Sequence, residues 1–518
     1  MNQDTEDLPL GWETASIESI AQTATGGTPS RKQSPYYGGS IPWVKSGDLN
    51  DGVIVETSET ITTEGLANSN AKIFPKGAVC VALYGATVGK LGILEINAAT
   101  NQAVCGVFPE GGIESKFVFY SLRNERENLI SQAQGGAQPN ISNGIVKETI
   151  LRIPPLNEQR RIVAKIEALQ ERSRKAREAL AEVGPLLEQF RQSLLAAAFR
   201  GDLTADWRAA NPNVEPASEL LNRIRQERRR HWEESEQAKF EKKNTKPKND
   251  KWREKYPESQ PLKFDGELPA IPQTWEWTNW DSLTMWITYG FTRPMPHVDM
   301  GPMIVTAKNV RNEGLRLDVV DHTTEEAFAE LNPKDLPVPG DILIIKDGAT
   351  TGRAALVPDE IGEFCINQSV GVVWLKYSPM HRLFLLRWVQ SPLIQKMIQE
   401  AMAGMAMPHL SVTDFKAMPV PIPPLEEQLA ICEVLEFGLG TADSLRASTF
   451  ESESELTQLD QSILAKAFRG ELVPQDPNDE PASELLARIR RMRDAVEDQT
   501  NSKARKASKK TRKKSTSA

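Results

Sequence analysis

Cysteine and histidine are scarce in this sequence, and their scarcity excludes several kinds of site. The 518 residues include only four cysteines and five histidines. The cysteines stand singly in apolar surroundings without a Cys-x-x-Cys pair, so we expect reduced thiols and neither a disulfide framework nor a zinc site. The histidines lack the spacing of metal ligands. No signal peptide and no apolar run of membrane length occurs in the sequence, which therefore predicts a cytoplasmic protein.

Signatures of common catalytic centres are missing as well. The loop at residues 85–90 resembles a phosphate-binding loop, but a P-loop needs glycine where Tyr84 stands and Ser or Thr where Leu91 stands. No nucleophile elbow, no paired nucleophile and base, and no target-amine tetrad of an amino-methyltransferase can be identified. A nuclease-like Glu-Lys-Lys at residues 241–243 lies in a charged helix with no apolar strand before it. We therefore expect no catalytic residue, no metal and no cofactor in this chain.

The chain is a tandem duplication. Pro-Pro-Leu-Asn-Glu-Gln at residues 154–159 returns as Pro-Pro-Leu-Glu-Glu-Gln at 423–428, and Ala-Phe-Arg-Gly-Asp-Leu at 198–203 returns as Ala-Phe-Arg-Gly-Glu-Leu at 467–472. Both pairs are 269 residues apart (423 − 154 and 467 − 198). Two long helices of equal length are therefore predicted between the motifs. The Pro-Pro pair supports each first turn, and the glutamate that follows complements the positive end of the helix dipole.

Apolar residues recur in the first helix at alternating steps of four and three, which is typical of a coiled-coil seam. The second helix keeps this pattern at both ends but has Gly438, Thr449 and Ser452 on the line, so its middle is expected to pack less well. Gly184-Pro185 is expected to bend or briefly break the first helix. An amphipathic surface helix explains one seam, whereas two seams separated by a domain favour intramolecular pairing. The subunit-interface candidates on the seams are Ile162, Ile166, Leu187, Leu194, Ile431, Leu435, Leu456 and Ile463.

Each helix follows a globular unit of short strands. Residues 5 to about 150 contain alternating strands broken by Gly, Pro and Asn, with a helical patch near residues 116–131. Residues 268–420 repeat this frame, since Gly-Ala-Thr-Val-Gly-Lys at 85–90 returns as Gly-Ala-Thr-Thr-Gly-Arg at 348–353, an offset of 263 (348 − 85). Between such landmarks the copies share little. This indicates two units that do the same kind of job on different targets.

The matched loops offer binding chemistry. Their glycines permit close backbone approach, a hydroxyl can donate, and the final Lys or Arg can reach a phosphate or a guanine edge. The Asn-Gln pair that follows in each unit can bond bidentately to adenine. Alternatively, the loops are simple hairpin turns and the amides tie down loops. The DNA-binding candidates, with one nearby lysine in each unit, are Lys45, Gly85, Thr87, Lys90, Asn101, Gln102, Lys308, Gly348, Thr350, Arg353, Asn367 and Gln368.

Charged segments follow each long helix. Glu-Pro-Ala-Ser-Glu-Leu-Leu occurs at residues 215–221 and again at 480–486, where Ser218 and Ser483 are expected to cap helices. Residues 204–267 are dense in Arg, Lys and Glu, and the tail from Lys503 onward is basic and expected to be disordered. The net charge is −8, but this uneven distribution leaves nucleic acid possible as a partner.

The repeated motifs at the start and end of each long helix resemble the repeated regions of the HsdS family, the DNA-specificity subunits of Type I restriction-modification enzymes. The resemblance covers almost the whole chain. It implies that each globular unit reads one half of a split double-stranded DNA target, while the paired helices set the spacing and hold two methyltransferase subunits. These partners would bring S-adenosylmethionine, and restriction/translocase subunits would bring ATP and Mg. The seam of about 50 Å predicts half-sites about one DNA turn apart.

We therefore predict a mixed α/β (α+β) chain with two target-recognition domains joined by an antiparallel coiled coil. The predicted function is a non-catalytic specificity subunit that binds DNA and partner subunits and has no membrane partner. Two alternatives are the specificity subunit of a related system whose partner fuses methyltransferase and nuclease, and a coiled-coil adaptor that does not bind DNA. The predicted segments are two domains (1–153, 268–422), two long helices (154–203, 423–473), a charged linker (204–267), and a short helix with a tail (474–518).

Overall fold

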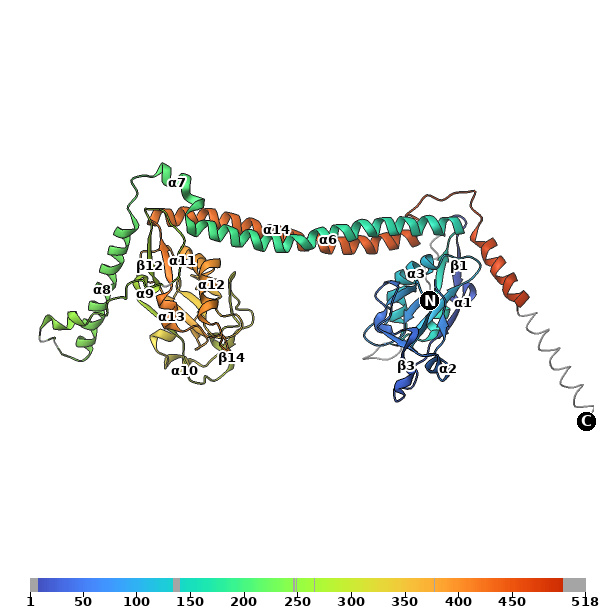
Figure 1. Cartoon of the computed structure of the whole chain (residues 1–518), viewed down its shortest axis with the longest axis horizontal. Helices are drawn as coiled ribbons and strands as arrows, with labels where there is room; N and C mark the ends of the chain where they lie inside the picture. Colours follow the sequence, from blue (N-terminus) through green and yellow to red (C-terminus); the bar gives the residue numbers. More distant parts are fainter. Residues whose placement is uncertain are drawn as a thin grey trace, which may run out of the picture. The chain divides into compact units, whose positions relative to one another are not determined.

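A computed structural model gives the structure of residues 8–496, apart from residues 134–139, 246, 248, 265 and 377. The chain forms two compact units. Unit 1 contains Met1–Ala181 and Phe450–Ala518, and unit 2 contains Glu182–Thr449. Each unit therefore combines a globular domain with parts of both long helices (Figure 1). The basic tail that the sequence predicts to be disordered lies outside the described residues.

The long helices α6 (Leu156–Arg200) and α14 (Leu425–Phe468) begin and end at the repeated motifs, as predicted. A bend or a brief break is predicted at Gly184-Pro185, and α6 is not broken there, because it continues through both residues. An interior proline removes one backbone hydrogen bond and destabilises a helix by about 3 kcal/mol. Pro185 is solvent-exposed, so its ring displaces no packed side chain, and seam packing before and after it holds the helix.

The two long helices pair within each unit. In unit 1, Arg177 of α6 forms an ion pair of 2.8 Å with Asp460, near the end of α14. In unit 2, Leu194 near the end of α6 lies against Gly438, near the beginning of α14. A Cβ at position 438 would lie 2.6 Å from the Leu194 side chain, so this glycine, which the sequence marks as a weak point, permits close approach of the helices. The early part of each helix pairs with the late part of the other, so the predicted antiparallel arrangement is confirmed.

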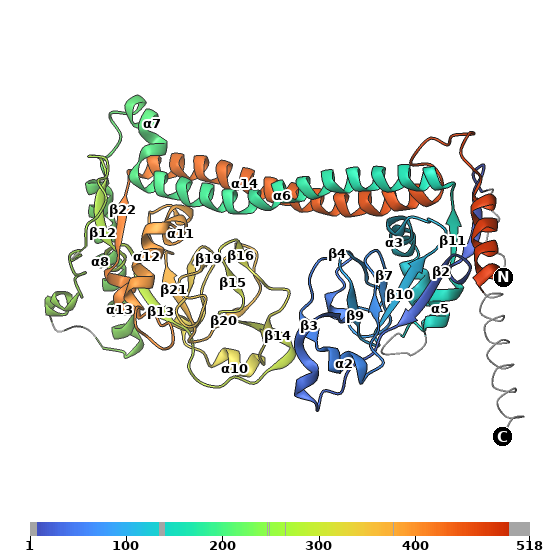
Figure 2. The same ribbon diagram turned by 45° about the vertical axis from the view of Figure 1, so that its right-hand side comes forward.

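The described residues of the unit 1 domain form three sheets (Figure 2). Strand β1 (Glu13–Ser16) pairs with β11 (Ile150–Ile153), immediately before α6. The five-stranded sheet has the order β2 (Ala21–Thr25), β10 (Val104–Pro109), β7 (Val79–Ala82), β8 (Leu91–Leu94) and β4 (Gly52–Ile54). The four-stranded sheet has the order β5 (Glu59–Ile61), β3 (Tyr37–Val44), β9 (Ala98–Thr100) and β6 (Ile73–Phe74). The helices are α1 (Ile17–Ile20), α2 (Thr63–Ala67), α3 (Ser115–Asn124), α4 (Arg126–Ser131) and α5 (Asn143–Glu148).

The domain of unit 2 repeats this frame. Strand β12 (Glu276–Asn279) pairs with β22 (Pro419–Ile422), immediately before α14. One sheet has the order β13 (Trp286–Tyr289), β21 (Val370–Trp374), β18 (Ile342–Ile345) and β19 (Ala354–Leu356), and another has β17 (Asp321–His322), β14 (Val298–Val305) and β20 (Phe364–Ile366). Strands β15 (Val310–Arg311) and β16 (Gly314–Leu315) form a short pair. The helices are α9 (Trp280–Leu283), α10 (Glu325–Ala329), α11 (Arg382–Val389), α12 (Pro392–Ala401) and α13 (Val412–Ala417).

A buried glutamate anchors the start of each long helix to its own domain. Glu158 accepts a hydrogen bond of 3.1 Å from the indole N–H of Trp12, and Glu427 accepts one of 2.8 Å from Trp275. Both carboxylates are about 1 % exposed or less. They therefore join helix to domain, besides lying at the positive end of the helix dipole.

The two anchors differ in how well they are satisfied. Glu427 also accepts a 2.7 Å hydrogen bond from Thr204 and forms an ion pair with Arg208. The corresponding positions of unit 1 are Val473 and Pro477 (473 − 204 and 477 − 208 both give 269), which offer neither a hydroxyl nor a cation. One oxygen of Glu158 has no hydrogen-bond partner among the described residues. Burial consequently raises the pKa of Glu158 above the usual carboxyl range.

The segments after the long helices dock on the domains. Helix α8 (Ala217–Lys242) follows α6 and α7 (Ala205–Ala210) and buries Leu220 and Ile224 in the core of unit 2. Residues 482–496 form a helix after α14 and bury Leu485 and Ile489 in the core of unit 1. The capping role expected of Ser218 is wrong, because Pro216 is the N-cap of α8, and Ser483 likewise lies inside its helix.

Candidate nucleic-acid interface

The matched glycine loops form the β7–β8 hairpin of unit 1 and the β18–β19 hairpin of unit 2. Gly89 donates a backbone hydrogen bond of 2.9 Å to Ala82, and Gly352 donates the equivalent bond of 2.8 Å to Ile345. Gly85 and Gly348 have φ of +90° and +98°, a backbone conformation that favours glycine. The conformation is the reason for glycine here, since an added Cβ would meet no atom within 4 Å. The backbone is therefore that of a hairpin turn. The Lys90 and Arg353 side chains, which end the two loops, are solvent-exposed.

In each Asn-Gln pair, the asparagine holds the backbone of a turn and the glutamine is exposed. The side-chain oxygen of Asn101 accepts a bond of 3.1 Å from the Ala103 N–H, and that of Asn367 accepts one of 3.1 Å from Ser369. Both asparagines thus close the turn before the next strand, which is the structural alternative considered for these amides. Gln102 and Gln368 are solvent-exposed, so the bidentate amide chemistry that adenine requires is left to these two residues.

The structure brings the candidate loops of unit 1 together. Thr87 of the β7–β8 hairpin donates a hydrogen bond of 2.9 Å to the Ser46 carbonyl, in the turn that follows β3. The backbone N–H of Asn101 donates to the Val44 carbonyl at 2.9 Å, and Thr28 donates to the side-chain oxygen of Gln102. These loops belong to different segments of the chain but meet at one edge of the domain, where Lys45 also lies.

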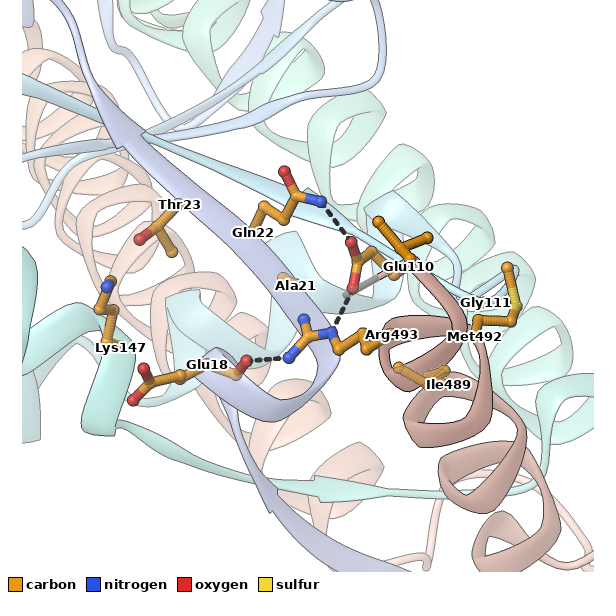
Figure 3. Close-up of a pocket in the computed structure, with 11 residues that line it drawn as sticks. Glu18, Ala21, Gln22, Thr23, Glu110, Gly111, Lys147, Ile489, Met492 and Arg493 are labelled. Atoms are coloured by element: carbon orange, nitrogen blue, oxygen red, sulfur yellow. Dashed lines mark hydrogen bonds and ion pairs between the residues drawn. The ribbon is translucent and has the colours of Figure 1, made fainter. Parts of the chain in front are cut away.

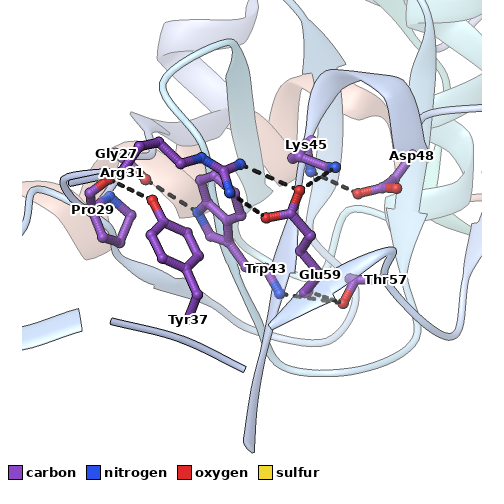
Figure 4. Close-up of polar contacts among 9 residues, drawn as sticks. All are labelled: Gly27, Pro29, Arg31, Tyr37, Trp43, Lys45, Asp48, Thr57 and Glu59. Carbon is purple, nitrogen blue, oxygen red and sulfur yellow. Dashed lines mark hydrogen bonds and ion pairs between the residues drawn. The ribbon is translucent and has the colours of Figure 1, made fainter. Parts of the chain in front are cut away.

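An Arg–Glu–Lys cluster lies beside these loops (Figure 4). The guanidinium of Arg31 bonds both oxygens of Glu59, at 2.6 and 3.3 Å, and the Lys45 ammonium lies 2.7 Å from the same carboxylate. Arg31 also stands over the rings of Tyr37, at 4.5 Å, and Trp43, at 5.1 Å. The hydrogen bond from Arg31 first, and that from Lys45 second, lower the pKa of Glu59 to about 2, so the carboxylate is ionised at neutral pH.

Sequence reasoning selected Lys45 and missed Arg31 and Glu59. Arg31 lies in a loop rich in Gly, Pro and Ser, and Glu59 is one polar residue of a short strand. Neither belongs to a motif that returns in the second copy. Their relation depends on the pairing of β3 with β5, which places Glu59 opposite Trp43. The available signal was only the aromatic pair of Tyr37 and Trp43 within β3.

The lysine candidate of unit 2 occupies a related but displaced position. Lys308 forms an ion pair of 2.7 Å with Asp321. Lys45 directly follows the last residue of β3, whereas Lys308 is the third residue after β14 (308 − 305). The two lysines are therefore not equivalent in the frame, although each pairs with a carboxylate of the adjacent strand.

A second group of charges lies beside the β18–β19 hairpin. Lys346 lies 2.7 Å from the carboxylate of Asp347, which His409 also contacts at 2.6 Å. Lys346 and Lys334 both stand over the ring of Tyr289, at 5.1 and 5.4 Å. These residues come from segments up to 120 positions apart (409 − 289), so no local motif of the sequence connects them. Unit 2 thus also carries cations and an aromatic ring next to its matched loop.

Most of the seam candidates pack into the hydrophobic core of their own unit. Ile162, Ile166, Ile431, Leu435 and Ile463 are 5 % exposed or less, since they pack into the cores beneath the helices. Side chains covered so fully by their own chain have no surface left for another subunit. Leu187, Leu194 and Leu456 are half-buried. The apolar side chains that remain exposed on the long helices include Leu186, Phe190, Phe437, Leu445, Phe450 and Leu459.

A cavity of about 640 Å³ lies at the other end of the unit 1 domain (Figure 3). It is bounded by β2, the end of β10 and the helix of residues 482–496. Arg493 bridges the carboxylate of Glu110, at 2.6 Å, and the carbonyl of Glu18. Strand β10 begins beside the candidate loops and ends at this cavity, so the two features occupy opposite ends of one strand. The cavity belongs to the docking of the last described helix.

Within the described ranges, no group of three or more His, Cys, Asp and Glu side chains is placed to hold a metal ion. None of the helices in these ranges combines the length and apolar character that a membrane span requires. The four cysteines are buried and unpaired, and burial raises the pKa of the Cys105 thiol to about 12.

The family model for the Type I restriction modification DNA specificity domain matches residues 9–183 and 299–437. The chain is 24 % identical over 473 residues to the specificity subunit of the Type I restriction enzyme EcoDI from Escherichia coli, and the match covers 90 % of each protein. It is 25 % identical over 384 residues to the EcoBI specificity subunit from the same species, covering 73 % of this chain and 70 % of that protein. The family model covers parts of both domains and the beginning of each long helix.

The fold is also that of solved specificity subunits. A chain from a study of assembly and conformational transition of the type I R-M system aligns with a TM-score of 0.62 and 21 % identity, covering 90 % of this chain and 99 % of that one. The HsdS subunit of Thermoanaerobacter tengcongensis aligns with a TM-score of 0.55 and 21 % identity, covering 91 % and 100 %. A duplicated domain with paired long helices thus defines a non-catalytic DNA specificity subunit. This chain belongs to the Type I restriction-modification specificity subunit (HsdS) family.

Proposed function

We propose that this specificity subunit reads a bipartite DNA target, with the domain of unit 1 recognising one half and the domain of unit 2 the other. The observation that carries this proposal is the pair of matched hairpins, each with an exposed terminal cation (Lys90 or Arg353) and an exposed glutamine nearby. Cations can contact phosphates, and glutamine can specify adenine. The surrounding residues differ between the copies, so the two half-sites differ in sequence.

The catalytic chemistry of the complex belongs to its other subunits. We propose that two methyltransferase subunits bring S-adenosylmethionine and that restriction/translocase subunits bring ATP and Mg. Exposed apolar side chains on the long helices support a protein partner there, since Phe437 and Phe450 are 80 % and 76 % exposed. Contiguous exposed apolar side chains mark protein interfaces, and Val434 and Phe437, three positions apart on α14, are both exposed.

A domain exchange tests the proposed division of labour. The chain is expressed with its cognate methyltransferase, and methylated adenines are mapped by long-read sequencing of genomic DNA. Replacing residues 268–420 with the matching domain of a homologue leaves the helices and the other domain unchanged. We expect one half of the methylated sequence to change while the other half and the spacing remain. Changes in both halves, or the absence of any bipartite target for the natural chain, would contradict the proposal.

A further inference from the structure

A carboxylate occupies the same place in the two domains. Glu59 lies opposite Trp43 across β5 and β3, and Asp321 lies opposite Ile304 across β17 and β14. Trp43 and Ile304 are each the next-to-last residue of their strand, and both strands pair in parallel with the strand that precedes the Asn-Gln pair. Each carboxylate holds one lysine, Lys45 or Lys308. Both domains therefore carry a strand carboxylate paired with a lysine beside the matched loops.

The donors around this carboxylate differ between the domains. In unit 1, Glu59 also holds Arg31, which stands over Tyr37 and Trp43. In unit 2, the residues at the strand positions of Tyr37 and Trp43 are Val298 and Ile304 (298 − 37 and 304 − 43 both give 261), so these two strand positions carry no aromatic ring. The other basic side chains near Asp321 are the imidazoles of His297 and His322. One frame thus carries a guanidinium on aromatic rings in unit 1 and imidazoles in unit 2.

Arg31 is fixed in place and still able to bind. A Cβ on Gly26 would lie 2.1 Å from the Thr100 carbonyl, and one on Gly27 would lie 2.3 Å from Asn70, so the loop leading to Arg31 is pressed against the domain. Glu59 accepts from two guanidinium nitrogens, which uses two of the five N–H groups. The remaining N–H groups have no partner among the described residues, and the side chain is 55 % exposed.

We propose that Arg31 is the specificity-determining residue of unit 1 that reads a guanine, by donating its free N–H groups to the O6 and N7 acceptors in the major groove. This inference rests on the DNA-reading function proposed above. A phosphate contact requires only a charge, which a flexible lysine supplies. A planar guanidinium held by a carboxylate and two rings meets the stricter geometry of bidentate base recognition, with little side-chain entropy left to lose.

The test uses the complex of the full chain with its methyltransferase. Initial methylation rates are measured on duplexes in which each base pair of both half-sites is replaced in turn, at several salt concentrations. The variants are Arg31→Lys, Arg31→Gln and Glu59→Gln. The control is Lys76→Ala, which removes an exposed cation that pairs with Glu95 at 3.2 Å. Lys76 precedes the first residue of β7, whereas the candidate hairpin follows the last one. Gel filtration and thermal unfolding establish that each complex is assembled.

We expect both Arg31 variants to lose about 5- to 150-fold discrimination at one G·C pair of one half-site. Glu59→Gln should lose less at the same pair, and the control should keep the full preference. A uniform loss on all duplexes with a salt slope lower by about one would make Arg31 a phosphate contact and overturn the inference. Unchanged discrimination, or a change in both half-sites, would overturn it too. If Arg31→Gln does not assemble, Arg31→Lys decides, because it keeps the charge. A natural complex without base preference would overturn the proposed function itself.

Discussion

Removing Arg208 should destabilise the start of α14 far more than its partly exposed position implies. Its guanidinium pairs with Glu427, which is fully buried and otherwise bonded only to Trp275 and Thr204. Arg208→Ala leaves a buried carboxylate without its counter-charge, and breaking a buried pair in this way costs about 3–5 kcal/mol. A matched control is Arg200→Ala, because Arg200 forms an ion pair of 2.7 Å with Asp202, and both side chains are about half exposed. Such a surface pair contributes about 0–1 kcal/mol.

Hydrogen exchange measured by mass spectrometry reports this change locally. Peptides that cover the start of α14 in Arg208→Ala should exchange roughly 150- to 5,000-fold faster, since each 1.36 kcal/mol of opening free energy is a factor of ten. Peptides that cover the start of α6 provide an internal reference, because Arg208 pairs with Glu427 and not with Glu158. Equal acceleration at the two helix starts, or an effect no larger than that of Arg200→Ala, would refute the idea that Arg208 compensates a buried charge.

Three further predictions concern the buried carboxylate of α6, the exposed phenylalanines of α14 and the matched glycine loops. Because the pKa of Glu158 is raised, its contribution to stability is present below the ordinary carboxyl pKa of about 4.5 and is lost as pH rises through the raised value. Glu158→Gln should remove this pH dependence, and it should slow hydrogen exchange at the start of α6 at pH 7. Phe437→Ser and Phe450→Ser should leave thermal unfolding within about 0.5 kcal/mol but weaken co-purification of the methyltransferase, and full retention would argue against an interface there. Lys90→Ala and Arg353→Ala should each weaken DNA binding and lower the salt slope by about one in a titration series, whereas unchanged isotherms would remove both loops from the DNA contacts.

The sequence by itself determined the architecture. The repeat offset of 269 residues and the seam periodicity predicted two long helices that pair within the chain, because both signals depend on spacing along the chain. The antiparallel direction of the pairing was predicted together with the resemblance to the HsdS family. The matched glycine loops were likewise predicted from the sequence to be hairpin turns or binding loops. The brief break, one of two outcomes predicted at Gly184-Pro185, does not occur, because local propensity weighs one missing hydrogen bond but not the packing that holds the rest of α6.

Only the tertiary structure decided which side chains meet. Arg31 and Glu59 are 28 residues apart, and Thr28 and Gln102 are 74 apart, so no local pattern connects them. Burial was decided in the same way: Ile162 reads as a seam residue, but the core of the domain covers it as well. A sequence shows where apolar and charged residues recur along an element. Which of them are satisfied inside their own chain, and which stay exposed for DNA or a partner, depends on strand register and docking between distant segments.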